Sequence, residues 1–264
     1  IKDALWTALK SLASAPKAER TLTGLAVLVQ SSALSQALAP YTLKGPYGHL
    51  LDGASENLSL SDVLHVEMEP LMQHKRLIPP VLTYLFHRLE ARFGGRPTLL
   101  VLDEAWTFLD EPMFAARIRE WLKTLRKKNV AVLFATQSLA DIERSAIAPA
   151  LIASCPTRIF LPTDRAPEPQ MRSIYERFGL NGRQIGILGL AAPKRDYYVQ
   201  SAQGNRLFEL GLGPVALAFT AASSPDDQKL IDRVSAEATD AGFADAFLRA
   251  KGLDWAADLL ASFP

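Results

Sequence analysis

The residues best suited to chemistry are an adjacent acidic pair, Asp103 and Glu104, which follows a short apolar run. Mg²⁺ prefers carboxylate oxygens and keeps much of its hydration shell, so Asp103 can hold such an ion through water. Glu104, on the neighbouring residue, points elsewhere and can orient or deprotonate an attacking water molecule. We therefore assign Asp103 as the metal-side acid and Glu104 as the water-side acid.

The element that must position this pair is the apolar run 98–102, which is bounded by Gly94-Gly95-Arg96-Pro97. A short continuous apolar run with such flanks predicts a strand buried on both faces. Ligands of open α/β sheets bind at the carboxyl ends of the strands, where the two acids would lie. An apolar strand ending in Asp-Glu is the Walker B pattern of NTPases, although an acidic pair can also follow a strand that has simply reached solvent.

A second apolar run, 129–135, predicts another strand, which ends in Thr136-Gln137-Ser138. The amide of Gln137 both donates and accepts hydrogen bonds, so it can contact a γ-phosphate oxygen and the attacking water together. Its alternative role is to cap the following helix. Residues 111–128 carry apolar side chains at helical spacing and supply the crossover that a parallel strand pair requires. Both polar tips should then lie on one edge of the sheet.

Several blocks, in this order, resemble the carboxyl-terminal ATPase region of the VirB4/TrbE/CagE family of type IV secretion and conjugation ATPases. The blocks are YTLKGPYGHLLDG (41–53), LLVLDEAWTFL (99–109), LRKKN (125–129), VLFATQSL (132–139), PKRDYY (193–198) and GNRLFELGLGPVALAF (204–219). The resemblance implies a RecA-like P-loop NTPase with a mostly parallel sheet, which uses ATP and Mg²⁺. It also implies a hexamer that energises a secretion channel together with other type IV secretion components.

Arg126 lies in the basic end of the helix that precedes the Gln137 strand. Its ordinary role there is to match the negative end of the helix dipole. In related hexameric conjugation ATPases, an arginine at the matching position reaches the nucleotide of the neighbouring subunit. The resemblance therefore implies that Arg126 acts in trans, where a guanidinium stabilises charge on the transferred phosphoryl group. Lys194-Arg195 and Arg206 remain alternatives, either for this role or as anchors of strand ends.

No stretch of the chain reads G-x-x-x-x-G-K-[ST], the loop that cradles the nucleotide phosphates. Without its backbone N–H groups and its lysine, affinity for nucleotide should largely vanish. The family places this loop upstream of Walker B, so we expect the chain to be a fragment that begins after it and is inactive alone. Two other hypotheses stay open: a HerA/FtsK-like DNA translocase motor, and a non-catalytic docking or assembly module.

Composition adds limits on partners and location. The 264 residues are 48% hydrophobic, and 29 basic side chains nearly balance 28 acidic ones. This balance gives no overall field that would hold DNA, although a local basic lining would not show in the sum. There is no apolar run of about 18 residues, so we expect membrane contact only through partners, at the cytoplasmic face of the inner membrane. The lone Cys155 also fits a reducing cytoplasmic compartment.

The pattern along the chain predicts three regions: a helical subdomain over 1–58, an α/β core over 59–220 and a helical tail over 221–264. Alternation predicts a strand over Val63–Met68, and apolar content predicts a buried strand over Thr157–Leu161. Residues 195–210 should form a hairpin, with Gly204 supplying a positive φ at the turn. Ser224-Pro225 signals a helix start. The four histidines are scattered, and we expect no metal site from them.

Overall fold

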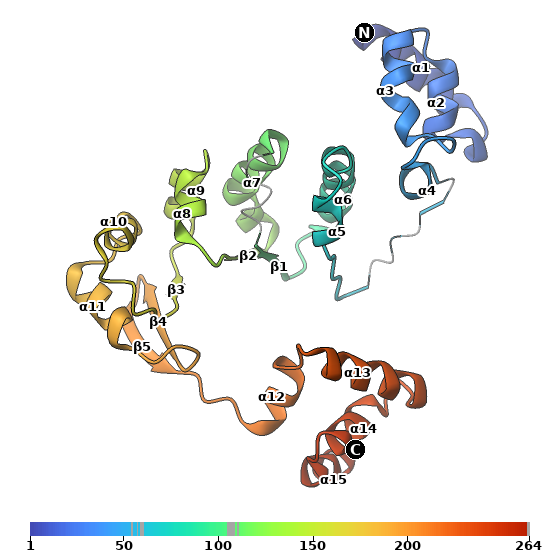
Figure 1. The fold of residues 1–264 in the computed structure, drawn as a ribbon. Helices are drawn as coiled ribbons and strands as arrows, with labels where there is room; N and C mark the ends of the chain where they lie inside the picture. The colour runs from blue at the N-terminus through green and yellow to red at the C-terminus, as the bar shows by residue number, and fades with distance from the viewer. Residues whose placement is uncertain (54, 57, 59–60, 105–108, 110, 263–264) are drawn as a thin grey trace. The chain divides into compact units, whose positions relative to one another are not determined.

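The computed structural model describes residues 1–53, 55, 56, 58, 61–104, 109 and 111–262. The chain forms two compact units, residues 1–154 and residues 155–264 (Figure 1). Residues 105–108, which belong to the LLVLDEAWTFL block, lie outside the described residues.

The first unit begins with three helices, α1 (Lys2–Ser14), α2 (Leu22–Leu28) and α3 (Ser32–Leu38). Thr21 and Ser31 cap α2 and α3 by accepting hydrogen bonds from the backbone N–H groups of Gly24 and Leu34. The helices pack around a buried cluster of Ala8, Leu25 and Val29. Three short helices complete this helical group, η1 (Lys17–Glu19), η2 (Ala39–Tyr41) and α4 (Gly48–Leu51).

The buried carboxylate of Asp52 joins α2 to the YTLKGPYGHLLDG block. It accepts hydrogen bonds from the backbone N–H groups of Leu22 (2.5 Å), Thr23 (3.0 Å) and Leu43 (2.8 Å), and from the Thr23 hydroxyl. A carboxylate at the first turn of a helix also matches the positive end of the helix dipole. In the same block, a Cβ on Gly48 would lie 2.0 Å from the carbonyl oxygen of Thr42, so the backbone approach requires glycine.

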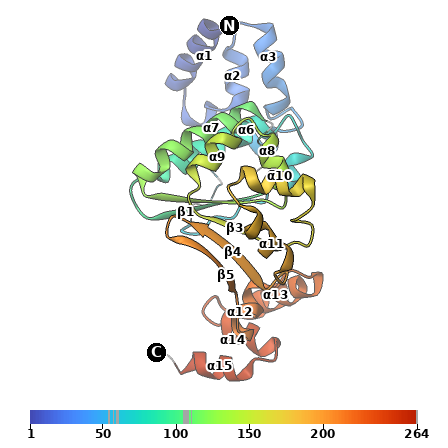
Figure 2. The same cartoon turned by 90° about the vertical axis from the view of Figure 1, so that its left-hand side faces the viewer.

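The rest of the first unit carries the predicted strand–helix–strand unit. Its elements are α5 (Glu69–Met72), α6 (Ile78–Arg92), β1 (Thr98–Asp103), α7 (Pro112–Thr124), η4 (Leu125–Lys128), β2 (Val130–Ala135), α8 (Leu139–Arg144) and α9 (Ala148–Ser154). The two strands are parallel, with the register running from Thr98 opposite Val130 to Asp103 opposite Ala135. Figures 1 and 2 place α6, α7, α8 and α9 on one side of this pair. The predicted parallel pair and its helical crossover are confirmed.

Aromatic packing holds the helical layer together. The Trp121 ring on α7 contacts Phe86 (centroids 4.7 Å apart) and Phe93 (5.6 Å), both edge to face. Its indole N–H donates to the carboxylate of Glu90 at 2.6 Å, and Arg117 donates to the same oxygen at 3.1 Å. The buried tryptophan thus satisfies its polar atom while its ring fills the core.

The expectation that the first strand is buried on both faces is wrong for this chain. Burial alternates along β1, and the side chains of Leu99 and Val101 are 64% and 53% exposed. On β2, Leu133 is exposed as well. Helices among the described residues cover one face of the strand pair only, so the apolar side chains of the other face remain uncovered.

The strand predicted over Val63–Met68 is also wrong. These residues form no helix or strand, and Val63 is 84% exposed. Alternation of apolar and polar residues describes a possible sheet face, but a strand also needs a neighbour for its backbone hydrogen bonds. No described strand pairs with this segment.

The second unit contains a three-stranded antiparallel sheet in the order β3-β4-β5. Its elements are β3 (Arg158–Phe160), α10 (Pro169–Arg177), α11 (Gly182–Leu190), β4 (Asp196–Ser201) and β5 (Gly204–Glu209). Phe160 and Tyr198 are buried on the face that α10 and α11 cover (Figure 2), whereas Ile159 is exposed on the opposite face. The strand expected over Thr157–Leu161 is therefore present but only half buried. The β4–β5 hairpin is confirmed, with φ +125° at Gly204.

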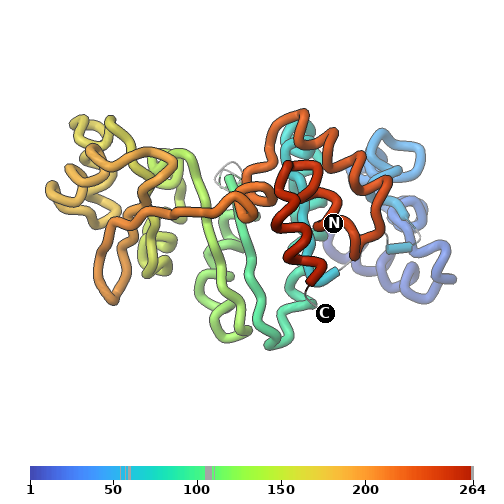
Figure 3. The backbone as a smooth tube through the Cα atoms, turned by 90° about the horizontal axis from the view of Figure 1, so that it is seen from below, coloured from blue at the N-terminus to red at the C-terminus, as the bar shows by residue number. Residues whose placement is uncertain are grey.

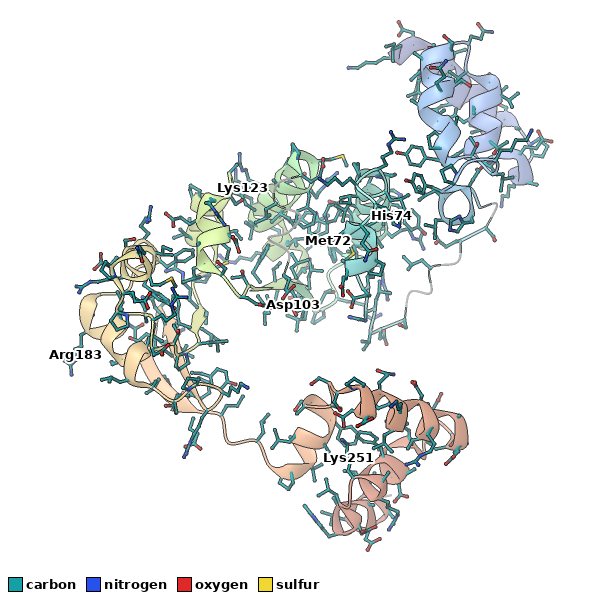
Figure 4. All side chains as sticks on the ribbon, in the orientation of Figure 1. Met72, His74, Asp103, Lys123, Arg183 and Lys251 are labelled. Atoms are coloured by element: carbon teal, nitrogen blue, oxygen red, sulfur yellow. The ribbon has the colours of Figure 1, made fainter. Side chains whose placement is uncertain are left out.

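Four helices form the tail: α12 (Pro214–Thr220), α13 (Pro225–Glu237), α14 (Phe243–Ala250) and α15 (Asp254–Ala261). Ser224 and Asp227 form a reciprocal capping box at the start of α13, as the sequence signal predicts. Lys251, labelled in Figure 4, forms an ion pair with Asp227. Helix α12 is not indicated by the sequence pattern. None of the helices among the described residues is long and apolar enough to cross a bilayer.

The Asp52 clamp leads to a stability prediction. Burial raises the pKa of the Asp52 carboxyl, but the hydrogen bonds from Thr23, Leu22 and Leu43 outweigh it and lower the pKa below its ordinary value. Asp52→Asn should lower the free energy of unfolding by about 2 kcal/mol at neutral pH, because charge-assisted hydrogen bonds are lost. The deficit should shrink as the pH falls through the lowered pKa, since wild-type Asp52 is then protonated too.

Urea unfolding of both proteins between pH 3 and pH 7 measures the effect. The matched control is Asp62→Asn, because the carboxylate of Asp62 is exposed and lies 3.6 Å from the equally exposed guanidinium of Arg96. An Asp52→Asn deficit that is equal at every pH, or no larger than that of Asp62→Asn, contradicts the assignment.

Candidate functional site

The register of β1 and β2 brings the predicted strand-end residues to one edge. Asp103, the last residue of β1, lies opposite Ala135, the last residue of β2, so Glu104 and Thr136 follow at the same level. Figure 3 shows the two strands running side by side, and Figure 4 labels Asp103. The carboxyl ends of both strands therefore present Asp103, Glu104 and Gln137 together, as the sequence predicts.

Glu104 leaves the strand in a left-handed conformation, with φ 48°. Its backbone N–H still donates to the carbonyl oxygen of Ala135 at 3.1 Å, so the sheet ladder extends one residue beyond β1. A left-handed backbone costs a non-glycine residue of order 1 kcal/mol and is concentrated at functional sites. The turn redirects the Glu104 side chain relative to the alternation of the strand.

The side chains of Glu104 and Gln137 contact each other directly. The Gln137 Nε2 group donates a hydrogen bond to Oε1 of Glu104. The alternative role of Gln137 as a helix cap is not observed: the N-cap position of α8 belongs to Ser138, and no side-chain cap hydrogen bond is present there. The amide instead faces the acid that we assigned to water.

Thr136 is a positioning residue that the sequence analysis did not identify. Its hydroxyl donates to the carbonyl oxygen of Ser138 and accepts from the Ser138 N–H, both at 3.1 Å. This small turn holds Gln137 between its two ends. The signal was present in the Thr-Gln-Ser order, because threonine often forms such a turn two residues before its partner.

The donor set at this edge fits magnesium bound partly through water. Asp103 offers an exposed carboxylate, and no group of three or more His, Cys, Asp or Glu side chains among the described residues forms an all-protein metal cage. Mg²⁺ is commonly held in this way, by one or two carboxylates together with phosphate oxygens and water. Asp103 is the residue that would hold the ion.

Arg126 lies at the opposite end of the strand pair. With Pro97, Thr98, Leu99 and Asn129 it lines an open hollow of about 560 Å³ at the amino ends of β1 and β2. Six strand residues at about 3.3 Å each separate this end from Gln137, which amounts to roughly 20 Å. The structure therefore does not bring Arg126 together with the other three predicted residues within one chain.

The alternative basic residues have local partners or lie on an exposed strand. Arg195 forms a two-point ion pair with Glu209 across β4 and β5, at 2.8 and 2.9 Å. This contact raises the pKa of the Arg195 guanidinium and anchors the open end of the hairpin. Lys194 has a positive φ of 64° at the approach to β4, and Arg206 is exposed on β5.

Comparison with known proteins identifies the class to which this arrangement belongs. The family model described as the TraG P-loop domain matches residues 29–197. Among solved structures, the VirB4 structure of Thermoanaerobacter pseudethanolicus is similar, with a TM-score of 0.55 and 19% identity over 81% of this chain and 64% of that one. The parallel pair with its strand-end polar residues thus belongs to a RecA-like P-loop NTPase fold.

Two curated relatives narrow the class. The conjugal transfer protein TrbE of Rhizobium radiobacter is 50% identical over 219 residues, which are 83% of this chain and 27% of that protein. A probable conjugal transfer protein TrbE of Sinorhizobium fredii is 48% identical over 237 residues, or 89% of this chain and 36% of that protein. The chain belongs to the VirB4/TrbE family of type IV secretion ATPases. It spans about a quarter to a third of the length of these relatives.

The backbone of Glu104 allows a prediction that separates strain from function. Glu104→Gly should leave the free energy of unfolding unchanged within about 0.5 kcal/mol, because relief of the left-handed strain offsets the greater freedom of glycine in the unfolded chain. Ala135→Gly, on the neighbouring strand, is the control and should cost about 0.5–1 kcal/mol. Urea unfolding compares the two variants. Equal losses in both would contradict the strain assigned to Glu104.

Proposed function

We propose that this chain carries the Walker B and sensor residues of an ATP-hydrolysing motor that energises type IV secretion or conjugative transfer. The observation that carries the proposal is the Gln137–Glu104 hydrogen bond at the carboxyl edge of a parallel strand pair. Membership of the VirB4/TrbE family supports it. As in those systems, the motor would act with other secretion components.

Each residue has a role that its position allows. Asp103 would hold Mg²⁺ through water, and the bound ion would neutralise charge on the phosphate oxygens. Glu104 would accept a proton from the attacking water as general base. Gln137 already donates to Glu104, so on arrival of nucleotide its amide can exchange this contact for the γ-phosphate and the water. Gln137 would thereby report whether ATP is present.

The phosphate-binding loop would come from polypeptide that this chain does not contain. The matched family is a P-loop domain, yet no G-x-x-x-x-G-K-[ST] stretch occurs in the sequence. Without the loop, the chain lacks the N–H groups and the lysine that bind the β- and γ-phosphates. We infer that the chain alone binds ATP weakly and does not turn it over.

Arg126 would serve the site of a neighbouring copy. Its distance from Gln137, roughly 20 Å along the strands, prevents action within its own chain. In a closed ring of copies, such as a hexamer, the amino ends of the strands of one subunit can face the carboxyl edge of the next. An arginine supplied in this way couples hydrolysis to the contact between subunits.

A complementation experiment in the complete protein tests both the activity and the trans role. Arg126→Ala and Glu104→Gln should each abolish ATP turnover, while nucleotide binding is kept. Mixed in equal amounts with subunit exchange, the two inactive proteins should regain about a quarter of wild-type turnover, since that share of sites pairs an intact Glu104 with an intact Arg126.

Lys128→Ala is the matched control, because Lys128 is a basic neighbour that does not line the hollow. It should retain turnover. Full turnover by Arg126→Ala rejects the role of the arginine, full turnover by Glu104→Gln rejects the site itself, and a mixture as inactive as its parents rejects action in trans.

A further inference from the structure

The tail helices form an apolar groove that the strand-end site does not use. Its volume is about 370 Å³, and its eight lining residues are all apolar: Val215, Phe219, Ala244, Leu248, Trp255, Ala256, Leu259 and Leu260. They come from α12, α14 and α15 at spacings of three to five residues, so each helix contributes one face. Leu248 and Ala256 are buried at its floor, whereas Trp255 is 57% exposed at its wall. An exposed patch of this kind marks an interaction site.

The lining argues against a small polar ligand. Binding sites for metabolites combine an apolar wall with a few convergent polar groups that fix orientation, and this groove has none among its lining residues. Rows of apolar residues from three helices instead match the groove that receives an amphipathic helix.

Charge is unevenly distributed along the chain. Residues 213–264, which build the groove, carry eight acidic and four basic side chains, a net charge of −4. Residues 1–212 carry 25 basic and 20 acidic side chains, a net charge of +5. The near-neutral total therefore hides two regions of opposite sign. The acidic tail disfavours nucleic acid and favours a basic partner, and the rest of a second copy of this chain is such a partner.

Helix α1 offers an apolar strip of the complementary kind. Trp6, Leu9 and Ala13, spaced by three and four residues, are exposed on a different face from the buried Ala8, and Trp6 is 60% exposed. Lys10 lies over the Trp6 ring at 5.3 Å from its centroid. The strip thus presents one large aromatic anchor and one aliphatic anchor beside a basic group, as helices that dock into grooves do.

We propose that the groove formed by α12, α14 and α15 binds helix α1 of a second copy of this chain, with Trp6 and Leu9 as the inserted side chains. The contact joins different surfaces of the two copies, so it is heterologous and can propagate from copy to copy. It goes beyond the motor assignment, because it needs neither nucleotide nor the strand-end residues. Its failure would leave the complementation result untouched.

The 264-residue chain itself is the material for the test, with molar mass measured by sedimentation across micromolar concentrations. The wild type should associate as its concentration rises, and high salt should weaken this association by screening the opposite charges. Trp6→Asp and Leu259→Asp should each remain monomeric, with unchanged circular dichroism because both side chains are exposed. Leu217→Asp, an exposed leucine of α12 outside the groove lining, is the control and should associate as the wild type does.

Mixing the two monomeric variants gives a sharper result. Trp6→Asp keeps an intact groove and Leu259→Asp keeps an intact α1 strip, so together they should form a dimer that grows no further. A wild-type chain that stays monomeric at all concentrations overturns the proposal. So does a Trp6→Asp protein that associates like the wild type, or a mixture in which no dimer forms.

Discussion

The parallel, in-register pairing of β1 with β2 is the constraint on which the rest of the site depends. Asp103 and Ala135 end the two strands at the same level, and the N–H of Glu104 extends the ladder by one further bond. Glu104 and Gln137 therefore emerge at one edge, 33 positions apart in the chain, and their side chains meet. A shift of register by one residue would move these side chains to other faces.

The same pairing also explains what this chain does not do alone. The helices of the first unit cover one face of β1 and β2, while Leu99 and Val101 stay exposed on the other. A parallel strand pair is normally covered on both faces. The uncovered face and the missing phosphate-binding motif point in the same direction, because both are supplied in our proposal by polypeptide outside this chain.

Local signals predicted the regions of the fold that local physics determines. The spacing of Phe114, Ile118 and Trp121 predicted α7, the Ser224 cap predicted α13, and Gly204 predicted the hairpin turn. The prediction failed where a tertiary partner decides the outcome. Val63–Met68 has the alternation of a strand but no neighbouring strand among the described residues, and burial of both faces of β1 depends on elements that the run 98–102 cannot reveal.

The candidate site was predictable to a similar degree. Residue types and strand ends indicated that Asp103, Glu104 and Gln137 lie at one edge, since parallel strands end together. The left-handed backbone of Glu104 and the Thr136 turn were not predicted, because they depend on how each chain leaves its strand. Arg126 was assigned from family resemblance, and its distance from the edge shows why strand spacing alone would not have selected it.

Disulfide formation between engineered cysteines measures the strand register most directly. In a Cys155→Ser background, cysteines at Val101 and Leu133, which are register partners on the accessible face, should cross-link efficiently on oxidation. Cysteines at Leu99 and Leu133, offset by two residues on the same face, should cross-link poorly. Equal cross-linking of the two pairs, or preference for the offset pair, would contradict the register and with it the shared edge of Asp103, Glu104 and Gln137.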